Sequence, residues 1–286
     1  MRRTCSVARR LQRDGAVWPL PVLSAHDARA MRLRLGVELS GAKDFKRSDL
    51  LYYKSHLVFG VVDELARHPA IVAAAQDALG SRDLLLWDSS VPLKPAAAAG
   101  AAAAAQHFPW HQDATYWGLE PAGGAVSCWV ALSDASRAHG CMRVIRGSHA
   151  EGQRPHALRP ADPGSMLRRG QRVDGVDDAA AEAMALRAGE MSLHHPWALH
   201  CSGPNTTRED RVGVVLVYAS PSTAPHNGRG SATLIAGRCD AAHWALSSRR
   251  PAARGAGSVA DAAALEAHAQ ALALHRGELQ ASRRPT

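Results

Sequence analysis

The sequence lacks the cysteine pattern of a disulfide-stapled or zinc-binding protein. Its 286 residues contain five cysteines, an odd number, and none of them form a CxxC pair: Cys5, Cys128, Cys141, Cys201 and Cys239. This spacing argues against both a disulfide framework and a zinc knuckle. We therefore expect all five to be reduced thiols.

Long hydrophobic runs are also absent. The basic start of the chain is not followed by the apolar run of a signal peptide, because Arg9, Arg10, Arg13 and Asp14 interrupt it. No stretch reaches the length that a helix needs to cross a bilayer. The expectation is a cytoplasmic protein with no membrane partner.

A basic stripe interleaved with aromatic residues is a third missing feature. The formal net charge is +8 and Arg far outnumbers Lys, but the basic residues are scattered along the chain. Nucleic acid is therefore not an expected partner. The charge instead favours a small-molecule substrate that is anionic or linked to an acidic carrier. Nothing in the sequence indicates the oligomeric state.

What is present is an ordinary globular composition, with 46% hydrophobic and 21% charged residues. One domain over residues 1–286 is expected, because all-β barrels and sandwiches often reach this length as a single unit. We expect N-terminal helices over about 24–80, a β core over about 83–220, and a C-terminal loop and helix over about 221–286.

Local signals support this division. Ser24 and Asp27 have capping-box spacing, and a helical block over 58–79 contains Pro69 as a helix start and Gly80 as a stop. Short apolar runs predict strands over 84–95, 125–132 and 211–218. The alanine-rich stretch 95–105 is predicted to be an inserted loop beside the site. The Gly-, Pro- and Ser-rich stretch 219–251 is predicted to be a long loop near the same place.

The candidate site begins at His111-Gln112-Asp113. On an extended backbone the first and third side chains share a face, so both could reach one metal ion while Gln112 points away. Two histidines and one carboxylate form the triad that binds Fe(II) and leaves other coordination positions open. His200, at the end of a predicted strand, is the best third ligand, and His194 or His195 is the alternative.

Arg211 begins an otherwise apolar predicted strand. A charge entering an apolar interior needs a partner. A bound dicarboxylate would fit, because the guanidinium offers a planar two-pronged match to a carboxylate. A strand-end pair with Asp210 or Glu209 is the alternative.

Taken together, these motifs resemble the phytanoyl-CoA dioxygenase family of Fe(II)- and 2-oxoglutarate-dependent oxygenases. The resemblance is carried by Lys94-Pro95, Trp110-His111-x-Asp113, Trp129-x-Ala131-Leu132-x-Asp134, the segment 140–149, and His200 to Asn205 followed by Arg211. It implies that His111, Asp113 and His200 are the iron ligands. It also implies that Arg211 binds the distal carboxylate of 2-oxoglutarate, and that Ser202 and Trp129 line the same co-substrate site.

The resemblance further implies a mainly β fold with flanking helices, a double-stranded β-helix (jelly roll) of the cupin type. Its cofactors would be Fe(II), 2-oxoglutarate and O2, and its activity the hydroxylation of a small-molecule or carrier-linked metabolite. Two alternatives stay open. One is a same-fold enzyme that catalyses desaturation, cyclisation or halogenation, although Asp113 fills the position that a halogenase leaves vacant. The other is a non-catalytic metal-binding protein with a cupin-like fold.

Overall fold

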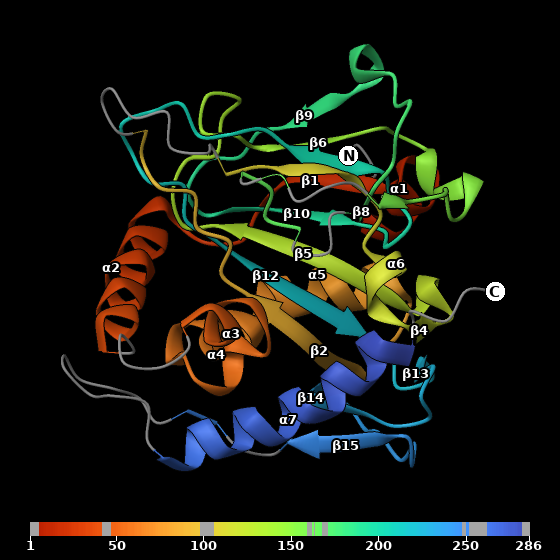
Figure 1. The fold of residues 1–286 in the computed structure, drawn as a ribbon. Coiled ribbons are helices and arrows are strands. Elements are labelled where there is room, and N and C mark those ends of the chain that lie inside the picture. The colour runs from red at the N-terminus through yellow and green to blue at the C-terminus, as the bar shows by residue number, and fades with distance from the viewer. Residues whose placement is uncertain are drawn as a thin grey trace, which may run out of the picture.

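Two β-sheets of unequal size form the core of the computed structural model, which describes residues 6–41, 47–97, 106–158, 162, 164–167, 171–247, 250–251 and 262–281. Figure 1 shows the larger sheet crossing the molecule, with helices packed against it. The helices are α1 (Val7–Asp14), α2 (Ala25–Gly41), α3 (Arg47–Tyr52), α4 (Gly60–Ala66), α5 (Pro69–Leu79), α6 (Ala114–Trp117) and α7 (Ala262–Ala281). The strands are β1 (Ala16–Pro21), β2 (Leu84–Ser90), β3 (Phe108–His111), β4 (Leu119–Glu120), β5 (Ala125–Ala131), β6 (Met142–Val144), β7 (Ala157–Leu158), β8 (Gln171–Arg172), β9 (Glu182–Met184), β10 (Glu190–His194), β11 (His200–Ser202), β12 (Gly213–Ala219), β13 (Ala224–Pro225), β14 (Gly230–Ala236) and β15 (Trp244–Ser247).

The larger sheet has seven strands in the order β1-β10-β5-β12-β2-β14-β15, and the smaller has four in the order β3-β11-β6-β9. Neighbours in the larger sheet are antiparallel except β14 and β15. Most pairings join strands that are far apart in the chain, as in a jelly roll. The predicted double-stranded β-helix with flanking helices is confirmed.

The two faces of the larger sheet have different neighbours. On one face, alternate residues such as Cys128, Val130, Val214 and Leu216 are completely buried in a cluster shared with α2, α4 and α5. Tyr218 links the sheet to the helices, because its hydroxyl donates a 2.8 Å hydrogen bond to the carbonyl oxygen of residue 66 in α4. The other face is therefore free to line a pocket.

The predicted N-terminal helix signals are confirmed. The Ser24 hydroxyl accepts a hydrogen bond from the backbone N–H of Asp27 at 3.0 Å. Pro69 is the first residue of α5, and Gly80 ends this helix with a φ of 61°, a left-handed conformation that glycine adopts without strain.

Two predictions about loops have different outcomes. The long loop expected over 219–251 is wrong, because this segment contains β13, β14 and β15, and β14 pairs with β2 in the larger sheet. The expected boundaries of the β core, 83–220, are too narrow for the same reason, and β1 also lies outside them. Most of the alanine-rich stretch, residues 98–105, lies outside the described residues, so its role as an inserted loop stays a prediction. The single-domain division stays a prediction as well.

The C-terminal helix α7 lies along β14 and β15 (Figure 1). Leu272 of this helix is buried, and His275 is 1% exposed. The helix thus contributes side chains to the interior beside β14. Among the helices in the described ranges, none combines the length and hydropathy of a membrane crossing.

Candidate metal and co-substrate site

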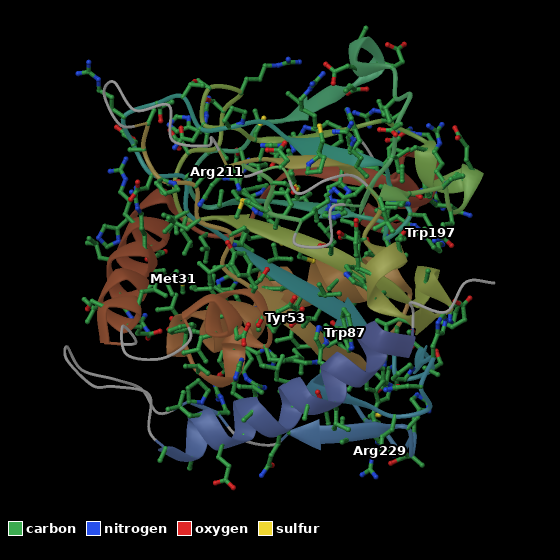
Figure 2. The ribbon with its side chains drawn as sticks, in the orientation of Figure 1. Met31, Tyr53, Trp87, Trp197, Arg211 and Arg229 are labelled. Atoms are coloured by element: carbon green, nitrogen blue, oxygen red, sulfur yellow. The ribbon has the colours of Figure 1, made fainter. Side chains whose placement is uncertain are left out.

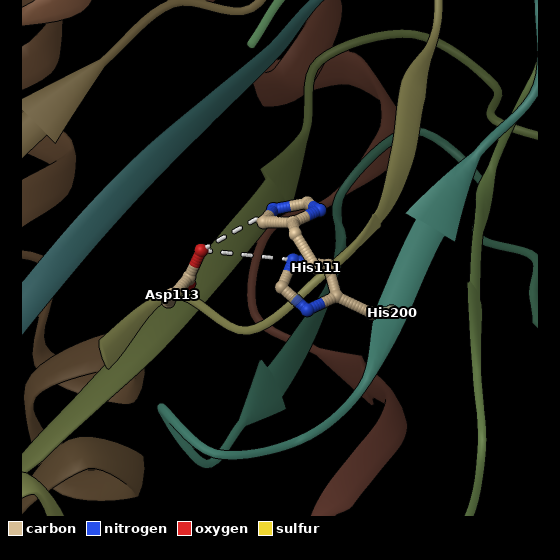
Figure 3. Close-up of side chains that lie close together, drawn as sticks. All are labelled: His111, Asp113 and His200. Atoms are coloured by element: carbon tan, nitrogen blue, oxygen red, sulfur yellow. Dashed lines mark ion pairs between the residues drawn. The ribbon is translucent and has the colours of Figure 1, made fainter. Parts of the chain in front are cut away.

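Three side chains converge where the two sheets meet. His111 ends β3, His200 begins β11, and these residues pair directly across the smaller sheet. The Nε2 atoms of His111 and His200 lie 3.5 Å and 3.7 Å from Oδ1 of Asp113, and the three side chains are 5%, 7% and 18% exposed. Figure 3 shows both imidazoles facing the carboxylate. The ligand atoms all lie within 4.8 Å of one another, so a single metal ion could contact all three.

The hydrogen bonds on the far side of each imidazole define which nitrogen faces the cluster. Nδ1 of His111 lies 2.8 Å from the carbonyl oxygen of Pro109, and Nδ1 of His200 lies 3.0 Å from that of Ala198. Each Nδ1 therefore carries the proton, and each Nε2 presents a lone pair toward Asp113. Three electron-pair donors then converge with no hydrogen between them, an arrangement that a divalent cation would stabilise.

Protonation in the cluster fits a metal site. Burial and the neighbouring His111 lower the pKa of His200 well below 6.5, so its imidazole is neutral near pH 7. Burial opposes the ionisation of Asp113, but the adjacent histidines outweigh it and keep its pKa well below the usual value. Neutral imidazoles and an ionised carboxylate are the forms that bind metals.

The local structure around Asp113 differs from the extended backbone that we expected. The strand ends at His111, and Asp113 has helical dihedral angles (φ −59°, ψ −43°) at the start of the short helix α6. The two side chains still converge, because the chain turns here. Gln112 points away as predicted: its amide donates to the carbonyl oxygens of Gly152 and Trp197, each at 2.8 Å.

His194 is part of the site, but not as the direct counterpart of His200. Its Nε2 lies 3.0 Å from Oδ2 of Asp113, the carboxylate oxygen that does not face the other two imidazoles. It is 3% exposed. His195 faces elsewhere, and its Nδ1 accepts a 3.0 Å hydrogen bond from the backbone of Trp197. Of the three candidates for the third ligand, only His200 joins His111 and Asp113 in one cluster.

Arg211 is 2% exposed and has no carboxylate partner within 4 Å among the described residues, so the alternative pairing with Asp210 or Glu209 is not present. Its Nη1 donates to the carbonyl oxygen of Gly140, while its buried Nε has no hydrogen-bond partner. Burial lowers its pKa to about 10, so it is still charged at neutral pH. A buried, charged guanidinium with an unused N–H donor is able to bind an anion.

Trp129 lies beneath this guanidinium, whose central carbon is 5.2 Å from the ring centroid. The indole occupies space that Gly213 leaves open on the neighbouring strand, since a Cβ at Gly213 would lie 2.2 Å from Cζ2 of Trp129. A cation–π contact with Trp129, which packs against Gly213, thus holds the guanidinium in position.

Lys94 is a functional candidate that we did not predict individually, although it stands in a motif of the resemblance. Its Nζ donates a 2.6 Å hydrogen bond to Oγ of Ser202, and its backbone pairs with that of Arg211. Burial and the nearby Arg211 lower its pKa to about 6. The signal in the sequence is a lysine between apolar residues and prolines, which does not reveal its contact with Ser202.

The site opens into two connected chambers. The first, which we call the arginine chamber, has a volume of about 180 Å³ and is lined by Arg211, Ser202, Trp129 and all three members of the cluster. The second, the aromatic chamber, has a volume of about 230 Å³ and is lined by His111, Asp113, Trp87 and several tyrosines. Because His111 and Asp113 line both, the chambers meet at the cluster, and four further residues are common to the two linings: Tyr52, Asp88, Phe108 and Trp117.

Three other histidines in the segments near the site have local contacts. His107 pairs with Asp162 at 3.1 Å, and His149 contacts the carbonyl oxygen of Gln12 at 3.1 Å. His156 accepts a 3.1 Å hydrogen bond from the backbone of Gln112. None of the three belongs to the metal cluster found among the described residues.

Comparison with known proteins points to one family. The model of the family described as "Phytanoyl-CoA dioxygenase (PhyH)" matches residues 11–213. A probable phytanoyl-CoA dioxygenase of Caenorhabditis elegans is 26% identical over 163 residues, which cover 56% of this chain and 51% of the relative. This chain thus spans about half the length of that curated relative.

Solved structures extend the match along the chain. The apo form of the non-heme monooxygenase ThoJ is 32% identical, with a TM-score of 0.82, and the alignment covers 97% of this chain and 98% of that chain. The epimerase SnoN, in complex with Fe3+, α-ketoglutarate and nogalamycin RO, is 27% identical with a TM-score of 0.57, over 76% of this chain and 84% of that chain.

Proposed function

This chain belongs to the phytanoyl-CoA dioxygenase family, and from that premise we propose that it is an Fe(II)- and 2-oxoglutarate-dependent dioxygenase that hydroxylates a small-molecule or carrier-linked metabolite. The balanced reaction consumes 2-oxoglutarate, O2 and a substrate C–H bond. It produces succinate, CO2 and a substrate C–OH bond. Iron(II), when bound, supplies the site at which O2 is activated and 2-oxoglutarate is chelated.

His111, Asp113 and His200 are the proposed metal ligands. Each imidazole is oriented through its protonated Nδ1, so the Nε2 lone pairs are aimed before the metal arrives. His194 donates to the second oxygen of Asp113 and leaves Oδ1 free for the metal. With only three protein ligands, a bound metal would have coordination positions left for co-substrate and O2.

Arg211 is proposed to bind the far carboxylate of 2-oxoglutarate. The guanidinium lines the same chamber as the three ligands, so one dicarboxylate could reach both the metal and the arginine. Ser202 lies two residues beyond His200, and its hydroxyl is held by Lys94 at 2.6 Å. Trp129 fixes the guanidinium from the other side. These four residues would position the co-substrate without taking part in the oxidation.

The observation that carries this proposal is that the metal-binding cluster and the buried guanidinium of Arg211 line one chamber. Converging electron-pair donors call for a cation, and the buried Arg211 calls for an anion. A divalent metal chelated by a dicarboxylate satisfies both. A purely structural metal site would give Arg211 no anion to bind, and the desolvation cost of burying its charge would then have no compensation.

A different oxidative outcome on the same site is the second candidate. The similarity to SnoN, an epimerase that was solved with iron and α-ketoglutarate, supports it. Both outcomes consume 2-oxoglutarate, but hydroxylation adds one oxygen atom to the product, and the atom comes from O2.

The test is an assay for succinate formation that depends on Fe(II) and 2-oxoglutarate, with cell-extract metabolites as substrates and ¹⁸O-labelled O2. The expected result is metal-dependent succinate together with a metabolite heavier by one labelled oxygen. Succinate with no labelled product would favour the second candidate. If 2-oxoglutarate neither binds nor is consumed, the oxygenase proposal is wrong.

A further inference from the structure

The aromatic chamber has an unusual lining. Six of its twelve lining residues are aromatic: Tyr52, Tyr53, Trp87, Phe108, Tyr116 and Trp117. No lysine or arginine lines it among the described residues. The carboxylates among the described lining residues are Asp113, which belongs to the metal cluster, and Asp88. An aromatic wall beside one available carboxylate is the chemistry that recognises organic cations.

A β-bulge directs both Trp87 and Asp88 into this chamber. Along β2 and β12, Val217 pairs with Asp88 and Tyr218 pairs with Leu86, so Trp87 is an extra residue without a partner on β12. In a regular strand, adjacent side chains leave opposite faces of the sheet, whereas a bulge redirects one of them. Here the bulge puts an indole and a carboxylate side by side on the pocket face.

Asp88 has one hydrogen bond and one histidine neighbour. Oδ1 accepts a 2.7 Å hydrogen bond from the backbone N–H of Lys54, and Oδ2 lies 4.0 Å from Nε2 of His275. The Lys54 ammonium is directed at the carbonyl oxygens of Trp87 and Ser231. No lysine or arginine ion pair to Asp88 is found in the part of the chain that the structure describes.

The aromatic rings around Asp88 form one connected group. The Trp87 ring centroid lies 5.5 Å from that of Trp117 and 4.9 Å from that of His275, and His275 lies 5.2 Å from Tyr53. Figure 2 shows Tyr53 and Trp87 near α7, the helix that carries His275. Arg211 is labelled well away from this helix. The carboxylate is therefore held in a largely apolar wall, 14% exposed.

The strand register measures how far Asp88 is from the metal cluster. His194, Ser127, Val217 and Asp88 pair in turn across β10, β5, β12 and β2, and directly paired residues share a face. The backbones of His194 and Asp88 are thus three strand spacings apart, about 14 Å. His194 touches Asp113, so Asp88 stands at the far end of a row that begins beside the metal ligands.

We propose that the substrate of this enzyme carries an organic cation, a quaternary ammonium or protonated amine, that binds beside Asp88 and the Trp87 and Trp117 rings while its reacting C–H bond lies at the metal cluster. This inference rests on the proposed function and specifies its substrate class. It is opposite in sign to the anionic substrate that the net charge of the chain favoured, because the local lining and not the total charge decides what enters a pocket.

A matched pair of probes tests the proposal. Choline and its neutral carbon isostere, 3,3-dimethyl-1-butanol, have the same shape and differ in charge. Each is titrated by ligand-observed NMR into the full chain loaded with Zn²⁺ and 2-oxoglutarate, a combination that cannot turn over. The expected result is that choline binds at least tenfold more tightly than the isostere.

Two variants localise the effect. In Asp88→Asn the side chain keeps its acceptor for the Lys54 N–H but loses its charge, and the preference for choline should fall at least tenfold. Glu266→Gln removes the same charge from an exposed position on α7 and should leave the preference unchanged.

The outcomes separate this inference from the proposed function. If wild-type protein binds Zn²⁺ and 2-oxoglutarate but does not prefer choline, the cation proposal is wrong and the oxygenase proposal stands. Tighter binding of the anionic analogue 3,3-dimethylbutanoate would restore the anionic substrate. A preference that survives in Asp88→Asn would overturn the role of this carboxylate.

Discussion

The arginine chamber and the aromatic chamber overlap at six residues, including His111 and Asp113 of the metal cluster, but the residues that line only one of them come from different elements. Arg211, Trp129 and Ser202 line only the arginine chamber and come from β12, β5 and β11 or their edges. Trp87 from a bulge in β2, Tyr116 from α6 and His275 from α7 line only the aromatic chamber. The first set comes from the β-sheets, and two of the three members of the second set come from helices.

The two chambers also differ in charge. Arg211, with Lys94 behind it, lines only the arginine chamber, whereas the carboxylate of Asp88 lies where the two chambers overlap. A dicarboxylate is attracted to Arg211 and repelled by Asp88. Two small molecules of opposite charge can thus be directed to different parts of one pocket by an arginine and a carboxylate that lie apart.

The largest expected effect is the loss of metal binding when a residue of the metal cluster is replaced. His200→Ala deletes one of the three proposed metal ligands and should abolish stoichiometric binding of Fe(II) or Zn²⁺, measured by metal titration. His194→Ala removes only the hydrogen bond to Oδ2 of Asp113, so we expect the metal affinity to fall roughly 10- to 100-fold. His195→Ala, which faces away, is the matched control and should bind normally. Stoichiometric binding by His200→Ala would show that another residue is the third ligand.

The next effect is confined to the arginine chamber. Arg211→Leu leaves the metal ligands intact but removes a charge-assisted contact from a desolvated site, a loss of about 2–5 kcal/mol, or roughly thirtyfold or more in affinity. The dissociation constant of 2-oxoglutarate, measured by calorimetry on the Zn²⁺-loaded protein, should rise accordingly. Arg208→Leu, in the exposed turn nearby, should change it little. Simultaneous loss of metal and co-substrate would indicate a structural role for Arg211.

A smaller effect tests whether the arginine chamber is as rigid as its strands suggest. Gly213→Ala places a Cβ 2.2 Å from the Trp129 ring, and overpacking of this kind costs about 1–3 kcal/mol of folding stability. Gly36→Ala is the control, because nothing lies within 4 Å of a Cβ there and the helix interior should gain up to about 1 kcal/mol. Denaturant unfolding measures both. If Gly213→Ala were as stable as the wild-type protein, the Trp129 indole would move aside at no cost in folding free energy.

The smallest expected effect is the uptake of a fraction of one proton when 2-oxoglutarate binds. Burial and Arg211 lower the pKa of Lys94 to about 6, so its amine is largely neutral at pH 8. A bound dianion nearby favours the charged amine and raises this pKa, so 2-oxoglutarate should bind with uptake of part of a proton, and its affinity should fall as the pH rises above about 6. Calorimetry in buffers of different ionisation enthalpy measures the uptake. Lys94→Met should show none, and undiminished uptake in that variant would assign the proton to another group.

Much of the arginine chamber could be predicted from the sequence. His111, Asp113, His200 and Arg211 each stand beside a recognisable strand or turn signal, and their residue types match the ligands of iron and of a dicarboxylate. Local pattern suffices here, because a strand end fixes where a side chain leaves the sheet. Even so, the extended backbone expected at Asp113 was wrong, since helix α6 begins there.

The aromatic chamber could not be predicted in the same way. Tyr53, Trp87, Trp117 and His275 are far apart in the chain, and no spacing among them has a period that indicates a shared wall. The bulge at Trp87 exists only because β2 pairs with β12 in a particular register. The strands in 230–247 were missed for a related reason: glycines, prolines and serines around them are typical of loops, yet β14 is held by its pairing with β2.

The sequence by itself determined the chemistry that is available: two histidines, a carboxylate and an arginine at positions where strands begin or end. Only the tertiary structure decided how these groups are used. It brought His194 against Asp113, Lys94 against Ser202 and Gly213 beneath Trp129, and it left Asp88 facing an aromatic wall. The physical reason is that periodicity along a chain reports which face of a local element is buried, whereas contacts between distant strands depend on register and packing that no single segment encodes.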